Sequence, residues 1–193
     1  MQTQTNTSPK RSMTTRTMVS CALLAALSVV LSRLFGMMPD ASSRFSIEAV
    51  PIFLAGMLFG PVAGGMVGFA ADFVGCLFSA YGYNPIFSIP PILYGVFAGL
   101  FRYFLGKGVS IPRLVVAILP PVVLGSVLYQ SLTLTYMYYE GAFMEGLIFY
   151  LSTRSVQFAI TGALDAVIIY FLFRAKIFER IGAWPPAERK KNS

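Results

Sequence analysis

The sequence predicts an all-α integral membrane protein, a bundle of six transmembrane helices with both termini in the cytoplasm. Three observations lead to this class: the scarcity of charge, the long apolar runs, and the grouping of the basic residues. Of the 193 residues, 56% are hydrophobic and only 12% are charged, about half the charged share of an ordinary soluble domain. The apolar residues form continuous runs of membrane-spanning length. A chain of this length has room for one such bundle and no second domain.

The expected spans are separated by short polar or glycine- and proline-rich turns. A polar segment, 1–16, precedes them and is expected to be a disordered cytoplasmic tail. Residues 17–175 form the membrane domain, and 176–193 form a basic cytoplasmic tail. In chain order, the expected spans are residues 17–36, 48–60, 62–80, 86–104, 114–137 and 147–173.

The basic residues set the orientation. The net charge is +7, and twelve of the fifteen Lys and Arg residues lie before the first span, between the fourth and fifth, or after the sixth. An even number of spans places these three segments on one side, which the positive-inside rule makes the cytoplasm. The charge therefore indicates an integral membrane protein in contact with the lipid bilayer, and it disfavours nucleic acid as a partner. The twelve residues are Lys10, Arg11, Arg16, Arg102, Lys107, Arg113, Arg174, Lys176, Arg180, Arg189, Lys190 and Lys191.

Residues for catalysis or for a resident cofactor are missing from the sequence. There is no histidine, and the two cysteines, Cys21 and Cys76, have no ligand spacing, so neither a metal site nor a disulfide framework is expected. The segment Gly106–Gly108 lacks the upstream glycine and the following Ser or Thr of a phosphate-binding loop. We expect no catalytic residues, no metal and no cofactor, and ATP hydrolysis would have to occur on a partner.

Small residues four apart indicate where helices approach closely. Gly60, Gly64 and Gly68 form one series, and Gly95 and Gly99 form another. For the glycines, packing inside the bundle is the simpler interpretation. Ala22 and Ala26, at the cytoplasmic half of the first span, are the candidates for docking to another membrane subunit.

Ionisable residues at membrane depth usually face the interior of a bundle or a cavity. Arg33, Asp72, Arg154 and Asp165 are of this kind. A polar stripe along the sixth span includes two of them, and a weaker stripe follows the fifth. The two stripes predict a wet or ligand-filled pocket, although a structural network is the competing interpretation for the two aspartates. The stripes are Tyr150, Arg154, Gln157, Thr161 and Asp165 in the sixth span, and Ser126, Gln130 and Thr133 in the fifth.

The remaining three basic residues suggest what the pocket binds. Arg33, Arg44 and Arg154 all fall in the outer half of the chain's expected topology, and arginine holds carboxylates through two parallel hydrogen bonds. Aromatic and amide side chains near them are suited to a flat heterocycle through stacking and edge hydrogen bonds. The candidates for this second role are Tyr83, Asn84, Tyr136 and Gln157.

Residues 44–102 resemble the substrate-binding S components of energy-coupling-factor (ECF) vitamin transporters, and are most like the folate-specific branch. The resemblance is carried by a proline-led second span, the "GPVAG" motif at 60–64, the series Gly68, Asp72 and Gly75, and the aromatic Asn-Pro loop at 83–85. The "ALLAA" motif at 22–26 matches the family's small-residue motif in the first span.

The resemblance implies a six-helix bundle that binds its vitamin near the outer surface under the loop between the first two spans. It also implies docking on a membrane T component coupled to two ATPases. The function expected is thus high-affinity binding of a vitamin, folate, for an ECF-type importer. The alternatives are an S component for pantothenate or a queuosine precursor, a small membrane enzyme using Asp72 and Asp165, and a scaffold without a ligand.

Overall fold

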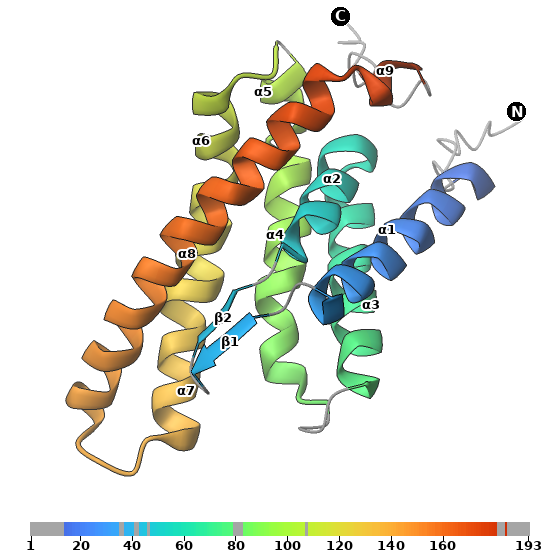
Figure 1. Cartoon of the computed structure of the whole chain (residues 1–193). Helices are drawn as coiled ribbons and strands as arrows, with labels where there is room; N and C mark the ends of the chain where they lie inside the picture. The colour runs from blue at the N-terminus through green and yellow to red at the C-terminus, as the bar shows by residue number, and fades with distance from the viewer. Residues whose placement is uncertain are drawn as a thin grey trace, which may run out of the picture.

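Helices form almost all of the chain that the computed structural model describes, which is residues 14–34, 37–40, 43–45, 47–78, 83–106, 108–180 and 184. Six helical segments carry the apolar runs, and Figure 1 shows them side by side with the long helix α8 crossing the others obliquely. Two short helices, α5 (Arg102–Gly106) and α9 (Ile177–Arg180), lie at the end where α8 finishes. The six segments are α1 (Thr15–Leu34), α2 (Ala49–Phe59), α3 (Pro61–Leu77), the 3₁₀ turn η1 (Pro85–Ser88) with α4 (Ile89–Leu100), α6 (Ile111–Pro121) with η2 (Val122–Tyr129) and α7 (Gln130–Tyr138), and α8 (Phe143–Arg174).

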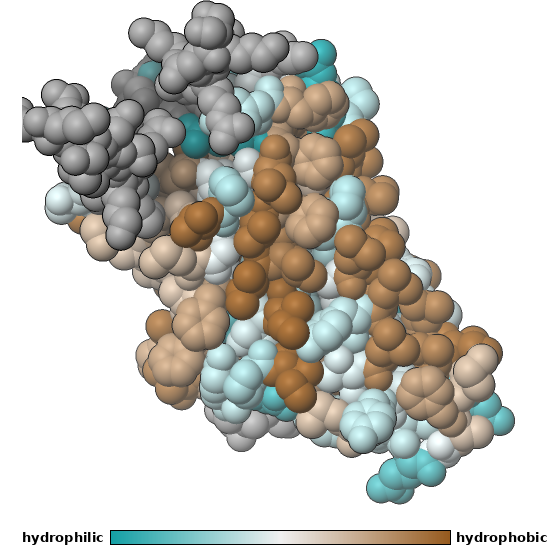
Figure 2. All heavy atoms as spheres, turned by 180° about the vertical axis from the view of Figure 1, so that it is seen from behind, coloured by the Kyte–Doolittle hydropathy of each residue, from teal (hydrophilic) through white to brown (hydrophobic). Residues whose placement is uncertain are grey.

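The helices have the length and composition of a membrane protein. Thr15–Leu34, Ile111–Tyr138 and Phe143–Arg174 are each long and apolar enough to cross a bilayer, and three shorter apolar helices accompany them. Large apolar side chains are exposed along the outside of the described chain, and Figure 2 shows columns of them over the rear face. Apolar surface of this extent is unfavourable in water and favourable in lipid. The predicted class of helical membrane protein is confirmed.

A short β-hairpin in the described chain was not predicted by the sequence analysis. Strands β1 (Met37–Asp40) and β2 (Ser43–Phe45) pair antiparallel, with Met37 opposite Phe45. β2 lies against α8, in front of the bundle in Figure 1. The expected loop between the first two helices therefore has regular structure and covers one side of α8.

Helices α2, α3 and α4 form the most closely packed part of the bundle. A Cβ atom at Gly64 would overlap the carbonyl group of Gly95, and one at Gly95 would overlap that of Gly64. Gly68 and Gly99 meet the facing backbone in the same way, whereas a Cβ atom at Gly75 would meet nothing within 4 Å. The predicted internal packing is confirmed for the first four glycines. It is wrong for Gly75, which lies beyond the region of close approach.

Helix α2 is central and short. Ten of its eleven residues, from Ala49 to Leu58, are buried. Eleven residues rise only about 16 Å, roughly half of the hydrocarbon thickness. Glu48, the residue before α2, is half-buried rather than fully exposed.

The fifth apolar segment changes its winding in the middle. Pro120 and Pro121 end α6, and the next eight residues form the π-helix η2 before α7 resumes α geometry. Prolines lack the N–H group that continues the regular ladder, and π-helical bonds link residues five apart. The wider turn changes which face of α7 points into the bundle.

The predicted tails lie mostly outside the described chain. Of the expected tail 1–16, residues 1–13 are not described, and α1 begins at Thr15. In the expected tail 176–193, α9 is followed by Trp184, which is buried with its ring 4.9 Å from that of Phe173. Arg189, Lys190 and Lys191 lie outside the described residues.

Candidate functional site

Helix α8 buries a stripe of polar side chains while its opposite face is apolar and exposed. Arg154, Gln157, Thr161 and Asp165 are all buried. Their spacings of three and four residues place them on one helical face. Val156, Ile160 and Leu164, between them in sequence, are exposed. The predicted polar stripe of the sixth span therefore faces the protein interior.

A second polar wall comes from η2 and α7. Ser126, Ser131 and Thr135 are buried there, whereas Gln130 and Thr133 of the predicted stripe are only partly buried. The π-helix explains the difference: its bonds span five residues, so the face that begins at Ser126 continues to Ser131 and then, through α-helical spacing, to Thr135. The prediction of two facing stripes is confirmed, with this change of residues in the fifth span.

Several polar atoms in this interior have no hydrogen-bond partner among the described residues. They are Ser131 Oγ, Arg154 Nε and Asp165 Oδ1. A buried polar atom of a protein is usually satisfied, and leaving one unsatisfied costs about 1–3 kcal/mol. The Arg154 guanidinium carbon lies 6.0 Å from the centroid of the Phe158 ring. The arrangement is suited to a polar ligand held between α8 and the η2–α7 segment.

Behind this interior, α4 contributes Tyr94, whose hydroxyl group is hydrogen-bonded to that of Ser126. Glu48 lies within electrostatic range of both Tyr94 and Asp165, and its backbone carbonyl accepts a 2.6 Å hydrogen bond from Ser28. The sequence analysis missed Tyr94 and Glu48. Tyr94 was missed because it is a single polar residue in an apolar run. Glu48 was missed because the polar segment before the second span is typical of an exposed loop.

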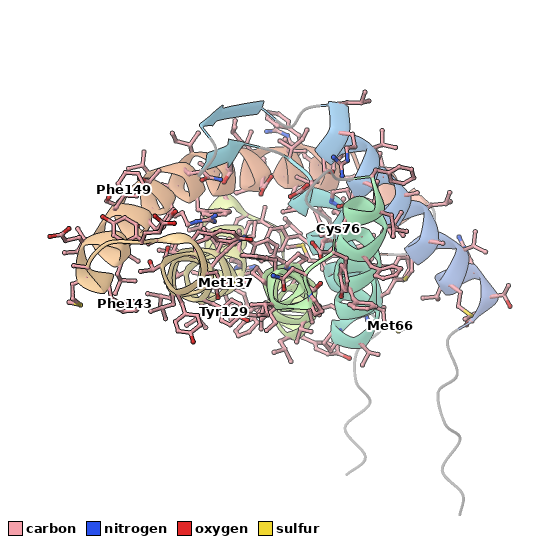
Figure 3. The ribbon with its side chains drawn as sticks, turned by 90° about the horizontal axis from the view of Figure 1, so that it is seen from below. Met66, Cys76, Tyr129, Met137, Phe143 and Phe149 are labelled. Atoms are coloured by element: carbon pink, nitrogen blue, oxygen red, sulfur yellow. The ribbon has the colours of Figure 1, made fainter. Side chains whose placement is uncertain are left out.

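The outer loop between α3 and α4 is held by its own polar contacts. Ser88 Oγ donates to Asp72 Oδ2 at 2.5 Å and can accept the hydrogen of the Tyr83 hydroxyl group, whose oxygen lies 3.1 Å away. Asn84 Oδ1 accepts the backbone N–H of Ile86 at 3.1 Å, and Asn84 Nδ2 lies 4.0 Å from Met137 Sδ. These contacts connect the loop to α3 and to α7. Figure 3 looks along the bundle from this end and shows side chains filling the space between α8 and the pair α7 and α4.

The structure separates the seven predicted ligand residues into groups. Arg154 and Gln157 lie together in the polar interior, and Tyr83 and Asn84 lie together in the outer loop. Arg33 is exposed and donates from Nη2 to the carbonyl group of Gly75, which ties α1 to α3. The remaining two are Arg44, whose backbone lies in β2 and whose side chain is outside the description, and Tyr136, which is 84% exposed.

The two predicted docking residues lie on the outside of the bundle. Ala22 and Ala26 are exposed on α1, and the neighbouring Leu23 and Leu27 are exposed with them. A cavity of ≈ 450 Å³ lies far from the polar stripe, at the end of α8 beside α9, where Tyr170, Arg174 and Trp184 line it. Within the described residues there is no group of three potential metal ligands.

Comparison with known proteins places this geometry in context. A family model described as "ECF transporter, substrate-specific component" matches residues 16–173. The folate transporter FolT of Clostridium novyi (strain NT) is 27% identical over 173 residues, which are 89% of this chain and 90% of that protein.

Solved structures are similar over comparable lengths. A crystal structure of FolT bound with folic acid is 29% identical, with a TM-score of 0.69, and the match covers 83% of this chain and 93% of that one. The S component for biotin from an ECF-type ABC transporter is 18% identical, with a TM-score of 0.59 over 84% of this chain and 95% of that one. The second likeness is one of fold.

Proposed function

This chain belongs to the family of ECF transporter substrate-specific components, and on that premise we propose that it is the folate-binding S component of an ECF-type importer. The observation that carries the proposal is the buried polar interior between α8 and the η2–α7 segment, with Arg154 at one end of it. Folate carries two carboxylates on its glutamyl tail, and a buried guanidinium with an unsatisfied N–H suits a carboxylate. The similarity to FolT supports folate over other vitamins.

The transport step requires partners. We propose that the chain docks through α1 on a membrane T component coupled to two cytoplasmic ATPases, because this sequence has no phosphate-binding loop of its own. Ala22 and Ala26 are exposed, so another helix could approach them closely. In this arrangement the chain binds the vitamin and the partners supply the energy.

The proposed topology has six spans in a bacterial plasma membrane, with both termini in the cytoplasm. The turn between α7 and α8 carries acids and lies at one end of Figure 1, while α5 and α9 lie at the other. Arg102, Arg113 and Arg174 are all near that second end, so the positive-inside rule makes it cytoplasmic.

Cysteine accessibility tests the orientation. In a Cys21→Ala, Cys76→Ala background, Ala142→Cys before α8 should react with an impermeant maleimide on intact cells, and Glu179→Cys in α9 should react only after lysis. Both positions are exposed in the fold. Labelling of Glu179→Cys on intact cells, with Ala142→Cys protected, would show that the topology is the reverse of the one proposed.

Binding by the purified protein tests the function. Without ATP and without partners, the solitary chain should bind radiolabelled folate saturably, and unlabelled pantothenate, biotin, thiamine or riboflavin should not displace it. Saturable binding of radiolabelled pantothenate or of a labelled queuosine precursor, with no folate binding, would reassign the substrate within the family. Binding of no vitamin at all would favour a scaffold role.

A further inference from the structure

The polar stripe of α8 changes the sign of its charge along its length. Arg154 lies on the stripe toward the end where α7 meets α8, and Asp165 lies eleven residues deeper. At 1.5 Å per residue these positions are about 16 Å apart, too far for the two side chains to neutralise each other. Both are buried, and each has an atom, Arg154 Nε and Asp165 Oδ1, without a partner in the described chain.

The deep end of the stripe is acidic. Asp165 is only 3% exposed, and its Oδ1 has no hydrogen-bond partner in the described chain. The Tyr94 hydroxyl group of α4 is hydrogen-bonded to that of Ser126. Leaving a buried polar atom unsatisfied is costly, so a bound ligand that supplies N–H donors would stabilise this position.

The proposed ligand has such donors at one end only. The pterin ring of folate has a ring N–H group and an amino group side by side, and this pair can form two parallel hydrogen bonds to one carboxylate, as a guanidinium does. The glutamyl tail at the other end has two carboxylates and suits Arg154. The aminobenzoyl group between them separates the two ends by a distance comparable with the spacing of Arg154 and Asp165.

We propose that Asp165 recognises the pterin ring, so that folate lies lengthwise along α8 with its pterin at Asp165 and its glutamyl tail at Arg154. This inference rests on the proposed function. It differs from the sequence-based assignment of the pterin to Tyr83, Asn84, Tyr136 and Gln157, of which only Gln157 lies on the same stripe, between Arg154 and Asp165. The first two of these hold the outer loop in place, and Tyr136 points away from the interior.

Fragments of folate separate the two ends in one experiment. Pteroate keeps the pterin and lacks the glutamate, and p-aminobenzoylglutamate keeps the glutamate and lacks the pterin. Their affinities are measured by displacement of radiolabelled folate from wild type, Asp165→Asn, Arg154→Ala and the control Glu145→Gln, which removes an exposed carboxylate from the same helix.

Asp165→Asn should weaken folate and pteroate at least tenfold and leave p-aminobenzoylglutamate unchanged. Arg154→Ala should weaken folate and p-aminobenzoylglutamate and spare pteroate, and Glu145→Gln should change none of the three. Equal effects of Asp165→Asn on both fragments, or no effect on either, would overturn the inference. If Asn84→Ala gave the pteroate-selective loss instead, the pterin would lie in the outer loop.

A change on the ligand keeps the inference testable if Asp165→Asn does not fold. A folate analogue without the 2-amino group removes one of the two donors, and wild-type protein should bind it at least tenfold more weakly than folate. Equal binding of the two compounds would overturn the role of Asp165. Absence of folate binding by the folded wild-type protein would instead reject the proposed function, so the two failures are distinguishable.

Discussion

Helices pack against one another in different ways in the two halves of the bundle. Helices α2, α3 and α4 touch backbone to backbone through glycines, and a Cβ atom at Gly64, Gly68 or Gly95 would overlap a carbonyl group of the facing helix. Helices α7 and α8, with η2, meet through buried hydroxyl, amide and charged groups, several of which have unsatisfied atoms in the described chain. Under the proposed function, the first half is the closely packed scaffold and the second half supplies the polar groups for the ligand.

The largest effect is expected where the scaffold has no room. Gly95→Ala places a methyl group against the carbonyl of Gly64, and only separation of α3 from α4 could accommodate it. We expect a loss of about 3 kcal/mol or more in stability, seen as a lower melting temperature in detergent. Gly162→Ala on α8, where a Cβ atom meets nothing within 4 Å, should leave stability equal or raise it by up to about 1 kcal/mol. Equal melting temperatures for Gly95→Ala and Gly162→Ala would contradict the expected difference between the two halves of the bundle.

The next largest effect is expected on folate uptake, from a change on the exposed face of α1. Ala26→Phe on the exposed face of α1 should abolish folate uptake by cells that carry the complete transporter, because a bulky side chain prevents close helix contact. Folate binding by the purified chain should remain. Ala159→Phe, the same change on an exposed position of α8, is the control and should preserve uptake. Loss of binding in Ala26→Phe would mean that the motif belongs to internal packing.

In the polar half, Arg154 should dominate affinity. Removing a buried charged partner costs about 2–5 kcal/mol, so Arg154→Ala should weaken folate binding by roughly 30-fold or more. Arg154→Lys should restore part of the affinity, since an ammonium group lacks the planar fork. Isothermal titration and thermal unfolding are measured on the same samples. Normal melting with unchanged affinity would remove Arg154 from the site.

The smallest effect on affinity should come from the η2–α7 segment that faces α8. Ser131→Ala removes a buried hydroxyl group whose oxygen has no partner in the described chain, and a neutral hydrogen bond to a ligand contributes about 0.5–1.5 kcal/mol. Folate affinity should fall by about two- to tenfold. Ser155→Ala, whose hydroxyl group is exposed and bonds only to its own helix at Leu151, should bind as wild type does. A higher melting temperature of Ser131→Ala with unchanged folate affinity would place Ser131 outside the site.

Patterns within single helices could be predicted because they depend on local spacing. Arg154 and Gln157 are three residues apart, so one helical face holds both wherever the helix lies. The pairing of α7 with α8 was predictable in outline, but Ser131 and Thr135 replaced Gln130 and Thr133 because the π-helix after Pro120 and Pro121 changed the winding. A window of sequence does not reveal which of several bonding ladders a proline pair will produce.

The sequence by itself determined the class of protein, the approximate helical segments and the residues available for binding. Those properties follow from the cost of placing charge and open backbone in lipid, which acts on each segment independently. Only the tertiary structure decided that Glu48 is half-buried, that Tyr94 pairs with Ser126, and that Asp165 has an oxygen without a partner in the described chain. Those facts depend on contacts between helices far apart in the chain, and the composition of any one segment does not encode them.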